Sequence, residues 1–105
     1  MFPATAKLAV EGMIAAREVQ VLTGAFPDYV FEKNYKLLNL KELENYINAN
    51  KHLPNIPSAK EVEENNGVKL GELNTKLLEK VEELTLYIIE QNKRIEALEK
   101  RVLKK

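Results

Sequence analysis

The sequence contains no cysteine and no tryptophan, and it has a single serine, a single histidine and a single aspartate among 105 residues. The missing cysteines exclude disulfides, thiolate metal ligands and cysteine nucleophiles. One histidine with scattered glutamates gives no ligand cluster at workable spacing, so we expect neither a metal nor another cofactor. Ser58, His52 and Asp28 are the residue types of a catalytic triad, but Ser58 lacks a strained nucleophile elbow. We therefore predict no catalytic residues and no enzymatic activity.

An excess of one charge and a long apolar run are also missing. Sixteen basic residues balance sixteen acidic ones, which leaves no electrostatic footprint for nucleic acid or an anionic membrane. The region 7–22 is interrupted by Glu11, Arg17 and Glu18, and no apolar run reaches the roughly 18 residues of a membrane span. We expect no nucleic-acid partner and no membrane insertion. The abrupt Met-Phe-Pro start suggests a fragment of a longer protein.

What the sequence does contain is a regular spacing of apolar residues over 70–102. With heptad positions lettered a to g, position a holds Val81, Ile88, Ile95 and Val102, and position d holds Leu70, Leu77, Leu84 and Leu98. Only Asn74 at a and Gln91 at d break the pattern. This alternation of three and four residues predicts a coiled coil. We interpret Gln91 as a polar layer that fixes register, in preference to an ion site.

The length of this helix bears on its partners. About 33 helical residues at roughly 1.5 Å each form a rod of about 50 Å. A compact domain of 100 residues has a radius of gyration of only about 13 Å, so the rest of the chain cannot cover the rod. We therefore expect an obligate oligomer that assembles along this helix.

The N-terminal region shows the alternation of β-strands. The residues Leu8, Val10, Gly12, Ile14 and Ala16 share one parity, which changes after Arg17 and Glu18 to Val19 and Val21. This pattern predicts two short strands separated by a bulge or a turn. Pairing between several chains about a common axis and an ordinary hairpin packed on its own domain are equal alternatives.

Aromatic residues and helix caps organise the middle of the chain. Phe26, Tyr29, Phe31 and Tyr35 lie between turn residues, and we interpret them as core anchors of a small domain, with a sugar-stacking surface as the alternative. Two capping boxes, Asn39 with Glu42 and Ser58 with Glu61, predict a helix over about 40–50 and a short helix after Ser58.

These features predict an α+β fold class that is mainly α, in three segments. Residues 1–24 form short strands at the end of a shaft, residues 25–68 form a small domain of capped helices, and residues 69–105 form the coiled-coil helix.

Two features bear on the number of chains. Branched residues at a with leucine at d favour a parallel dimer on the simplest rule. However, the run from Arg94 to Glu99 resembles the signature of short trimeric coiled coils, in which an arginine at g packs over the core and pairs with a glutamate at e of the next chain. We therefore predict a parallel homotrimer. Its interface residues are Leu77, Val81, Leu84, Ile88, Gln91, Ile95, Leu98, Val102, Arg94 and Glu99.

Ordered motifs cover nearly the whole chain. They are Leu8–Gly12, Ala16–Val19, Asp28–Glu32, His52–Ala59, and Leu70–Asn74 followed by Leu77–Ile88. Together they resemble a C-terminal module that closes many tail-fibre-like and cell-surface proteins of Bacteroidetes bacteria and their phages. The resemblance implies a trimeric fibre end on a virion tail fibre or at the cell surface, joined to an upstream fibre shaft.

The predicted function is therefore a non-enzymatic trimerisation and folding-registration module at the C-terminal end of a phage tail fibre or a bacterial surface fibre. Two alternatives stay open. A receptor-binding tip, for a glycan or another cell-surface receptor, would expose aromatic residues or a polar groove. A self-cleaving intramolecular chaperone, similar to those at the ends of phage fibres, would have a reactive Ser58.

Overall fold

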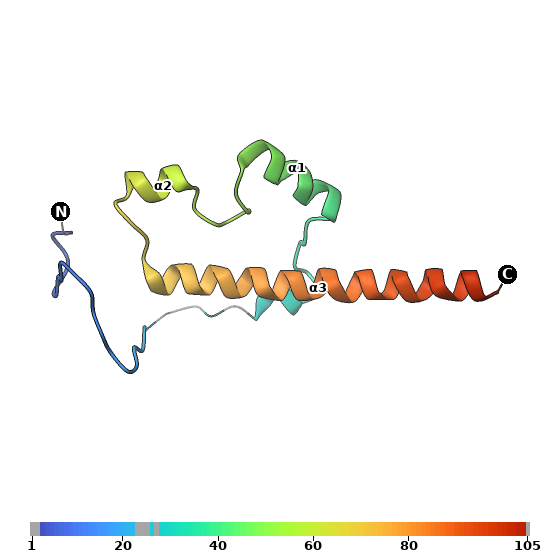
Figure 1. Cartoon of the computed structure of the whole chain (residues 1–105), viewed down its shortest axis with the longest axis horizontal. Coiled ribbons are helices and arrows are strands. Elements are labelled where there is room, and N and C mark those ends of the chain that lie inside the picture. The colour runs from blue at the N-terminus through green and yellow to red at the C-terminus, as the bar shows by residue number, and fades with distance from the viewer. Residues whose placement is uncertain (1–2, 23–25, 27, 105) are drawn as a thin grey trace.

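The computed structural model describes residues 3–22, 26 and 28–104, and helices are the only regular elements over these residues. In chain order they are the short 3-10 helix η1 (Tyr29–Phe31), α1 (Leu40–Asn50), α2 (Ala59–Glu64) and α3 (Leu70–Leu103). α3 runs along the longest axis of the molecule, while α1 and α2 lie along one side of its N-terminal part (Figure 1). The long C-terminal helix predicted from the heptads is therefore present.

The molecule is elongated because α3 extends beyond the other elements at its C-terminal end, while the N-terminal segment extends past the start of α3 at the opposite end (Figure 1). Its extents are 67 × 33 × 28 Å and its Cα radius of gyration is 19.5 Å, well above the value of about 13 Å for a compact domain of similar length. Every described residue from Ile88 to Lys104 is exposed. The rest of the single chain thus leaves the distal part of α3 bare.

The predicted N-terminal strands are absent from the described residues, so the α+β fold class is wrong and the described chain is all helical. Residues 3–22 form a turn at 4–5 followed by bends and irregular chain, and their apolar side chains, such as Leu8, Met13 and Leu22, are exposed. A strand needs a neighbour for its backbone groups, and no described segment of this chain pairs with 3–22. Residues 1, 2, 23 and 24 of the predicted strand segment lie outside the described residues.

α1 and α2 begin at the two predicted capping boxes. Glu42 N donates to the Asn39 side chain at 2.8 Å, and Asn39 N donates to the Glu42 side chain at 3.2 Å. Ser58 and Glu61 form the same reciprocal pair of hydrogen bonds. These bonds occupy backbone donors that the first turn of a helix leaves free. Both capping predictions are confirmed.

Left-handed residues turn the chain back after each of these helices. Lys51 ends α1 with a φ of 63°, and Asn66 follows α2 with a φ of 60°. Gly67 has a φ of 130°, which favours glycine, and its N–H donates to Val62 O at 2.9 Å. α2 thus lies close to the start of α3.

η1 attaches the middle of the chain to α3. Val30 of η1 is only 1% exposed and is the one buried hydrophobic residue among those described. The predicted aromatic core is wrong for Phe26, Tyr29 and Phe31, which are exposed. Tyr29 and Tyr35, with ring centroids 5.9 Å apart, instead direct their hydroxyls at α3. The single chain therefore has a very small core, and most of its apolar surface stays accessible.

Candidate oligomerisation interface

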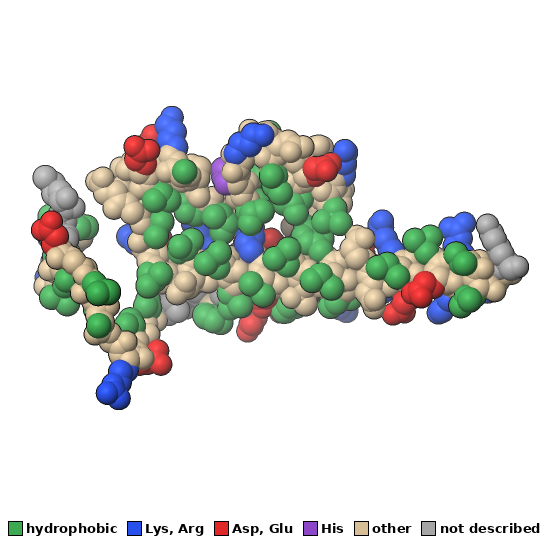
Figure 2. Space-filling model, in the orientation of Figure 1, with side chains coloured by type: hydrophobic (Ala, Val, Ile, Leu, Met, Phe, Trp, Pro, Cys, Tyr) green, Lys and Arg blue, Asp and Glu red, His purple; other side chains and the backbone are tan. Residues whose placement is uncertain are grey.

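The predicted seam lies on one open face of α3. Its apolar members are 46–70% exposed, and Gln91 is exposed as well; the apolar set is Leu77, Val81, Leu84, Ile88, Ile95, Leu98 and Val102. Hydrophobic side chains continue along α3 to its distal end, where charged side chains lie beside them (Figure 2). An exposed apolar face of this length on a single chain, interrupted only by Gln91, marks an interaction surface.

The chain covers other positions of α3 and leaves the seam clear. Ten residues of α3 are buried or half-buried, and they occupy only positions b, c, e, f and g of the heptad; they are Gly71, Leu73, Thr75, Leu78, Glu79, Lys80, Glu82, Glu83, Leu86 and Tyr87. Every a and d position from Leu70 to Val102 is exposed. Packing within the chain and the heptad seam therefore use separate faces of one helix.

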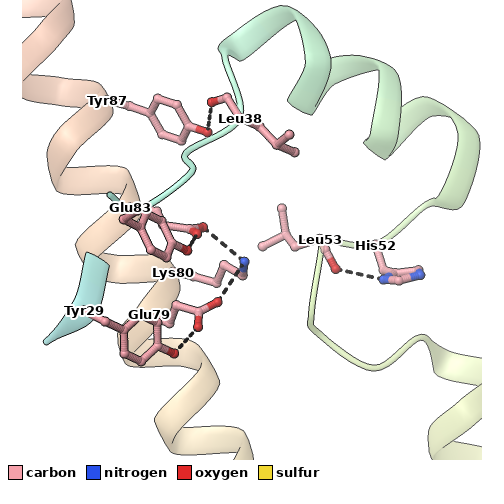
Figure 3. A network of polar contacts seen from close by, with 9 residues as sticks. Tyr29, Leu38, His52, Leu53, Glu79, Lys80, Glu83 and Tyr87 are labelled. Atoms are coloured by element: carbon pink, nitrogen blue, oxygen red, sulfur yellow. Dashed lines mark hydrogen bonds and ion pairs between the residues drawn. The ribbon is translucent and has the colours of Figure 1, made fainter. Parts of the chain in front are cut away.

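Polar contacts fix the covered face. Glu79, Glu83 and Tyr87 are four residues apart, so they lie on successive turns of one face of α3. Tyr29 donates a hydrogen bond to Glu79, Tyr35 donates one to Glu83, and Tyr87 Oη donates to Leu38 O at 2.6 Å (Figure 3). We call these three contacts the tyrosine ladder. They hold segment 29–38 alongside α3, with both running in the same direction.

A buried ion cluster lies within the tyrosine ladder. Glu79 and Lys80 are each 7% exposed. Lys80 Nζ lies 3.3 Å from Glu79 Oε1 and 3.1 Å from Glu83 Oε1, and it points toward the loop that carries Leu53 (Figure 3). One buried ammonium thus bridges two carboxylates on consecutive turns. Removal of one member of such a pair would leave a buried charge without compensation.

Opposing effects set the pKa of Glu79. Burial of the carboxyl raises its pKa, but the hydrogen bond from Tyr29, the ammonium group of Lys80 and the nearby Asn55 side chain together outweigh burial and leave the pKa below the ordinary value of 4.5. A lowered folded pKa means that this carboxylate stabilises the fold at pH values above its unfolded pKa. That stabilisation is lost as the pH falls through the lowered folded value.

The pKa values of the two tyrosine hydroxyls that donate to these carboxylates are raised. The hydrogen bond to Glu79, with burial and the charges of nearby glutamates, raises the pKa of Tyr29 to about 12. Burial and the hydrogen bond to Glu83 raise the pKa of Tyr35 above its ordinary value as well. Both phenols therefore stay protonated across the neutral range and act as donors to the carboxylates.

The predicted interface charges lie on the bare part of α3. Arg94 Nη2 is 3.3 Å from Glu90 Oε1 within the same helix, and both side chains are largely exposed. Glu99 is exposed and makes no ion pair with any described residue. The single chain therefore does not bring Arg94 and Glu99 together, and the expected contact between chains stays a prediction.

Two of the three residue types of a triad, Ser58 and His52, make other contacts. Ser58 Oγ donates to Glu61 Oε1 at 3.1 Å and accepts from Glu61 N as the cap of α2. The His52 ring packs edge-on against Tyr46, with centroids 5.8 Å apart, and its Nδ1 lies 2.9 Å from Leu53 O. Asp28 directly precedes η1. The contacts of Ser58 are thus those of a helix cap.

A cleft of about 590 Å³ lies between α2 and the start of α3. Pro57, Val62 and Leu73 contribute its apolar wall. Its charged lining is balanced, with the carboxylates Glu61 and Glu72 beside the ammonium groups Lys69 and Lys76. This balance favours no ligand of either charge. Within the described part of the chain, no three potential metal ligands cluster and no helix is long and apolar enough to cross a bilayer.

Sequence reasoning missed the tyrosine ladder. Tyr29 and Glu79 are 50 residues apart in sequence, and no local spacing connects them. The available signal was a second stripe on the helix, because Glu79, Glu83 and Tyr87 repeat every four residues away from positions a and d. Such a stripe indicates that part of the helix packs against its own chain.

No protein-family model matches the chain, and searches of curated proteins and of solved structures also find no match. The resemblance to fibre ends therefore depends only on the motifs in the sequence.

Proposed function

We propose that the chain is a non-enzymatic module that joins three copies of itself and sets their register at the C-terminal end of a fibre. One observation carries this proposal: contacts within the chain occupy positions b, c, e, f and g of α3, while every a and d position is exposed. An apolar seam that its own chain leaves clear fits identical seams of other copies.

The charges beside the seam support a trimer. Arg94 at g and Glu99 at e are both exposed. In a parallel trimer, Arg94 would exchange its exposed contact with Glu90 for Glu99 of the next chain. Gln91 would form a polar layer, which selects one register because any shift would place the glutamine against apolar residues.

The tyrosine ladder supports a role in registration. Because the ladder ties segment 29–38 to fixed turns of α3, alignment of three α3 helices also aligns the three segments that precede them. Contacts within a helix are local in sequence and form quickly, whereas contacts between distant segments form slowly. Registration would therefore start at the C-terminus and extend toward an upstream shaft. The setting on a virion tail fibre or a cell-surface fibre follows from the sequence resemblance.

The test is the mass of the wild-type chain in solution, measured by light scattering coupled to size exclusion. We expect three chains per particle at micromolar concentration. A monomer would overturn the assembly itself, whereas a dimer would overturn only the number of chains.

A receptor-binding tip is a second candidate, because Phe26 and Phe31 expose aromatic rings that could stack on a sugar. The test is binding to a panel of glycans by the Phe26→Ala/Phe31→Ala variant. Leu8→Ala/Met13→Ala, which removes exposed apolar side chains elsewhere, is the matched control. Loss of binding in the first variant alone would support a receptor site, and no binding by the wild type would reject it for the glycans tested.

A further inference from the structure

α1 carries an apolar stripe that its own chain covers only in part. Leu40, Leu43 and Ile47 lie on one face of the helix, and with Glu44 and Asn48 they line a shallow depression of about 230 Å³. Leu40 is 44% exposed and Ile47 is 38% exposed. Both are thus more than one-third exposed, although the spacing is that of a helix face that packs against a partner.

The side of α3 on which α1 and α2 lie is defined by several contacts. Tyr87, at position g, donates to Leu38 O, two residues before α1 begins. Lys80, also at g, points toward the loop that carries Leu53 between α1 and α2 (Figure 3). Leu73 at g and Lys76 at c line the cleft beneath α2. The arm formed by residues 39–65 therefore lies along the flank of α3 made by positions c and g.

The opposite flank of α3 has an apolar residue that its own chain covers only in part. Ile89, at position b, is 46% exposed although it lies outside the seam. Thr85, at position e one turn before it, is also exposed. This flank, made by positions b and e, receives no contact from α1, because the arm lies on the other side of the seam.

Parallel coiled-coil geometry brings these two flanks together. Position g of one helix lies beside position e of the next helix, so the flank with c and g faces the neighbour's flank with b and e. The start of α1 and Ile89 also lie at similar heights along the axis of α3. α1 begins near the level of Tyr87, and Ile89 is two residues further, a rise of about 3 Å.

We infer that α1 of each chain docks on α3 of the next chain, with the stripe of Leu40, Leu43 and Ile47 over Ile89 and Thr85 of that neighbour. This inference rests on the proposed parallel trimer. It adds a second interface outside the seam, in which each arm bridges two helices and closes a ring of three contacts. The occupant of the groove on α1 is thus a second copy of this chain.

The absence of cysteine from the sequence makes a cross-linking test direct. The full chain carrying Leu40→Cys and Ile89→Cys is treated with a short bismaleimide and run on a denaturing gel. The second variant, Ile47→Cys with Thr85→Cys, samples the contact one turn lower on α3. The two single-cysteine variants of each pair are the controls, because a chain with one cysteine can be linked to only one other chain.

We expect covalent species of three chains from the double variants and at most two chains from the single variants. The mass of each unlinked variant is measured first by light scattering. A trimer that yields only cross-links within one chain, or none with either pair, would overturn the docking of α1 while leaving the trimer intact. A monomer would overturn the trimer and the docking together.

Discussion

The N-terminal and C-terminal parts of α3 differ in how much of the helix the rest of the chain covers. In the proximal part, from Leu70 to Tyr87, one face of the helix is covered by η1, segment 29–38 and the arm, and the opposite face carries the exposed seam. From Ile88 to Leu103 every described residue is exposed, and the seam is the only regular apolar feature. The proximal part is held by its own chain, whereas the distal part has nothing to pack on within one chain.

This difference indicates where the stability of each part comes from. An isolated helix of about 15 residues is marginal in water, so the distal part depends on continuation of the proximal helix and on the seams of other copies. The proximal part has buried contacts even in the absence of other chains, since Glu79 and Lys80 of α3 and Val30 of η1 are buried in the single chain. Assembly should therefore order the distal helix more than the proximal one.

The largest effect should come from charges placed in the seam. Ile88→Asp combined with Ile95→Asp would introduce two unpaired carboxylates into core layers of every chain. The free energy of assembly should become less favourable by on the order of 5 kcal/mol per chain. We expect loss of the trimer, measured by light scattering, and loss of helix signal from the distal part. The proximal contacts of the tyrosine ladder should persist, because neither substituted residue contributes to them.

The matched control is Lys93→Glu with Lys100→Glu, at two f positions that face away from the seam. This control changes the net charge more than the seam variant does, so charge alone would affect it at least as strongly. If the seam variant stayed trimeric by mass, the coiled coil would not be the assembly element.

The second effect should come from the proximal ion cluster. Lys80→Met keeps an apolar stem of similar length but leaves Glu79 and Glu83 without the ammonium group between them. The side chains of Lys80 and Glu79 are 9% and 10% exposed, and breaking a buried pair destabilises by about 3 kcal/mol. We expect a fall of that size in the free energy of unfolding, measured by urea titration. The addition of Glu79→Gln should restore part of it.

Lys41→Met is the control for this prediction, because Lys41 pairs with Glu44 at 3.2 Å on an exposed surface. Such pairs contribute roughly 0.5 kcal/mol or less. Equal losses in the Lys80 and Lys41 variants would mean that the proximal cluster is no more protected than a surface pair.

The sequence predicted those elements whose causes are local. Asn39 with Glu42 and Ser58 with Glu61 cap their helices through bonds that span three residues, so spacing alone identifies them. The heptads from Leu70 to Val102 predicted α3 for the same reason.

The predicted strands failed because the alternation near Val10 describes a side-chain pattern, whereas a strand also requires a partner segment. The tyrosine ladder was missed because it joins residues about 50 positions apart. The seam residues are placed on one exposed face as expected, but their contacts with other chains stay a prediction, since these depend on copies of the chain.

A third, smaller effect should appear at alkaline pH. The folded pKa of Tyr29 is raised from 10.0 to about 12, so above pH 10 the unfolded chain loses this proton while the folded chain retains it. Stability should therefore fall as the pH rises from 10 toward 12. Tyr29→Phe should flatten this slope, measured as the urea midpoint at both ends of that range. The control Tyr46→Phe, outside the ladder, should leave the slope unchanged; the same flattening in both variants would contradict the assignment to Tyr29.

The smallest effect concerns Gly71, at the base of the covered part of α3. Glycine is less favourable than alanine by up to about 1 kcal/mol in a helix interior, and Gly71 is the second residue of α3. Gly71→Ala should therefore stabilise α3 by less than this limit if the site had space. A Cβ at this position would lie 2.5 Å from Val21 Cγ1, however, which forces the side chain of Val21 to move. We expect the gain in helix propensity to be cancelled in the wild-type background.

The same substitution in a Val21→Ala background separates the two causes. With Val21 truncated at Cβ, the close approach to Cγ1 disappears, although Val21 Cβ itself would lie 3.7 Å away, at ordinary contact distance. Gly71→Ala should then stabilise the chain by up to about 1 kcal/mol, measured by urea titration as a double-mutant cycle. A coupling energy near zero would show that Val21 does not contact α3 in solution. In that case the covered part of α3 would begin at Leu73, which lines the cleft beneath α2, and the tyrosine ladder would hold only segment 29–38.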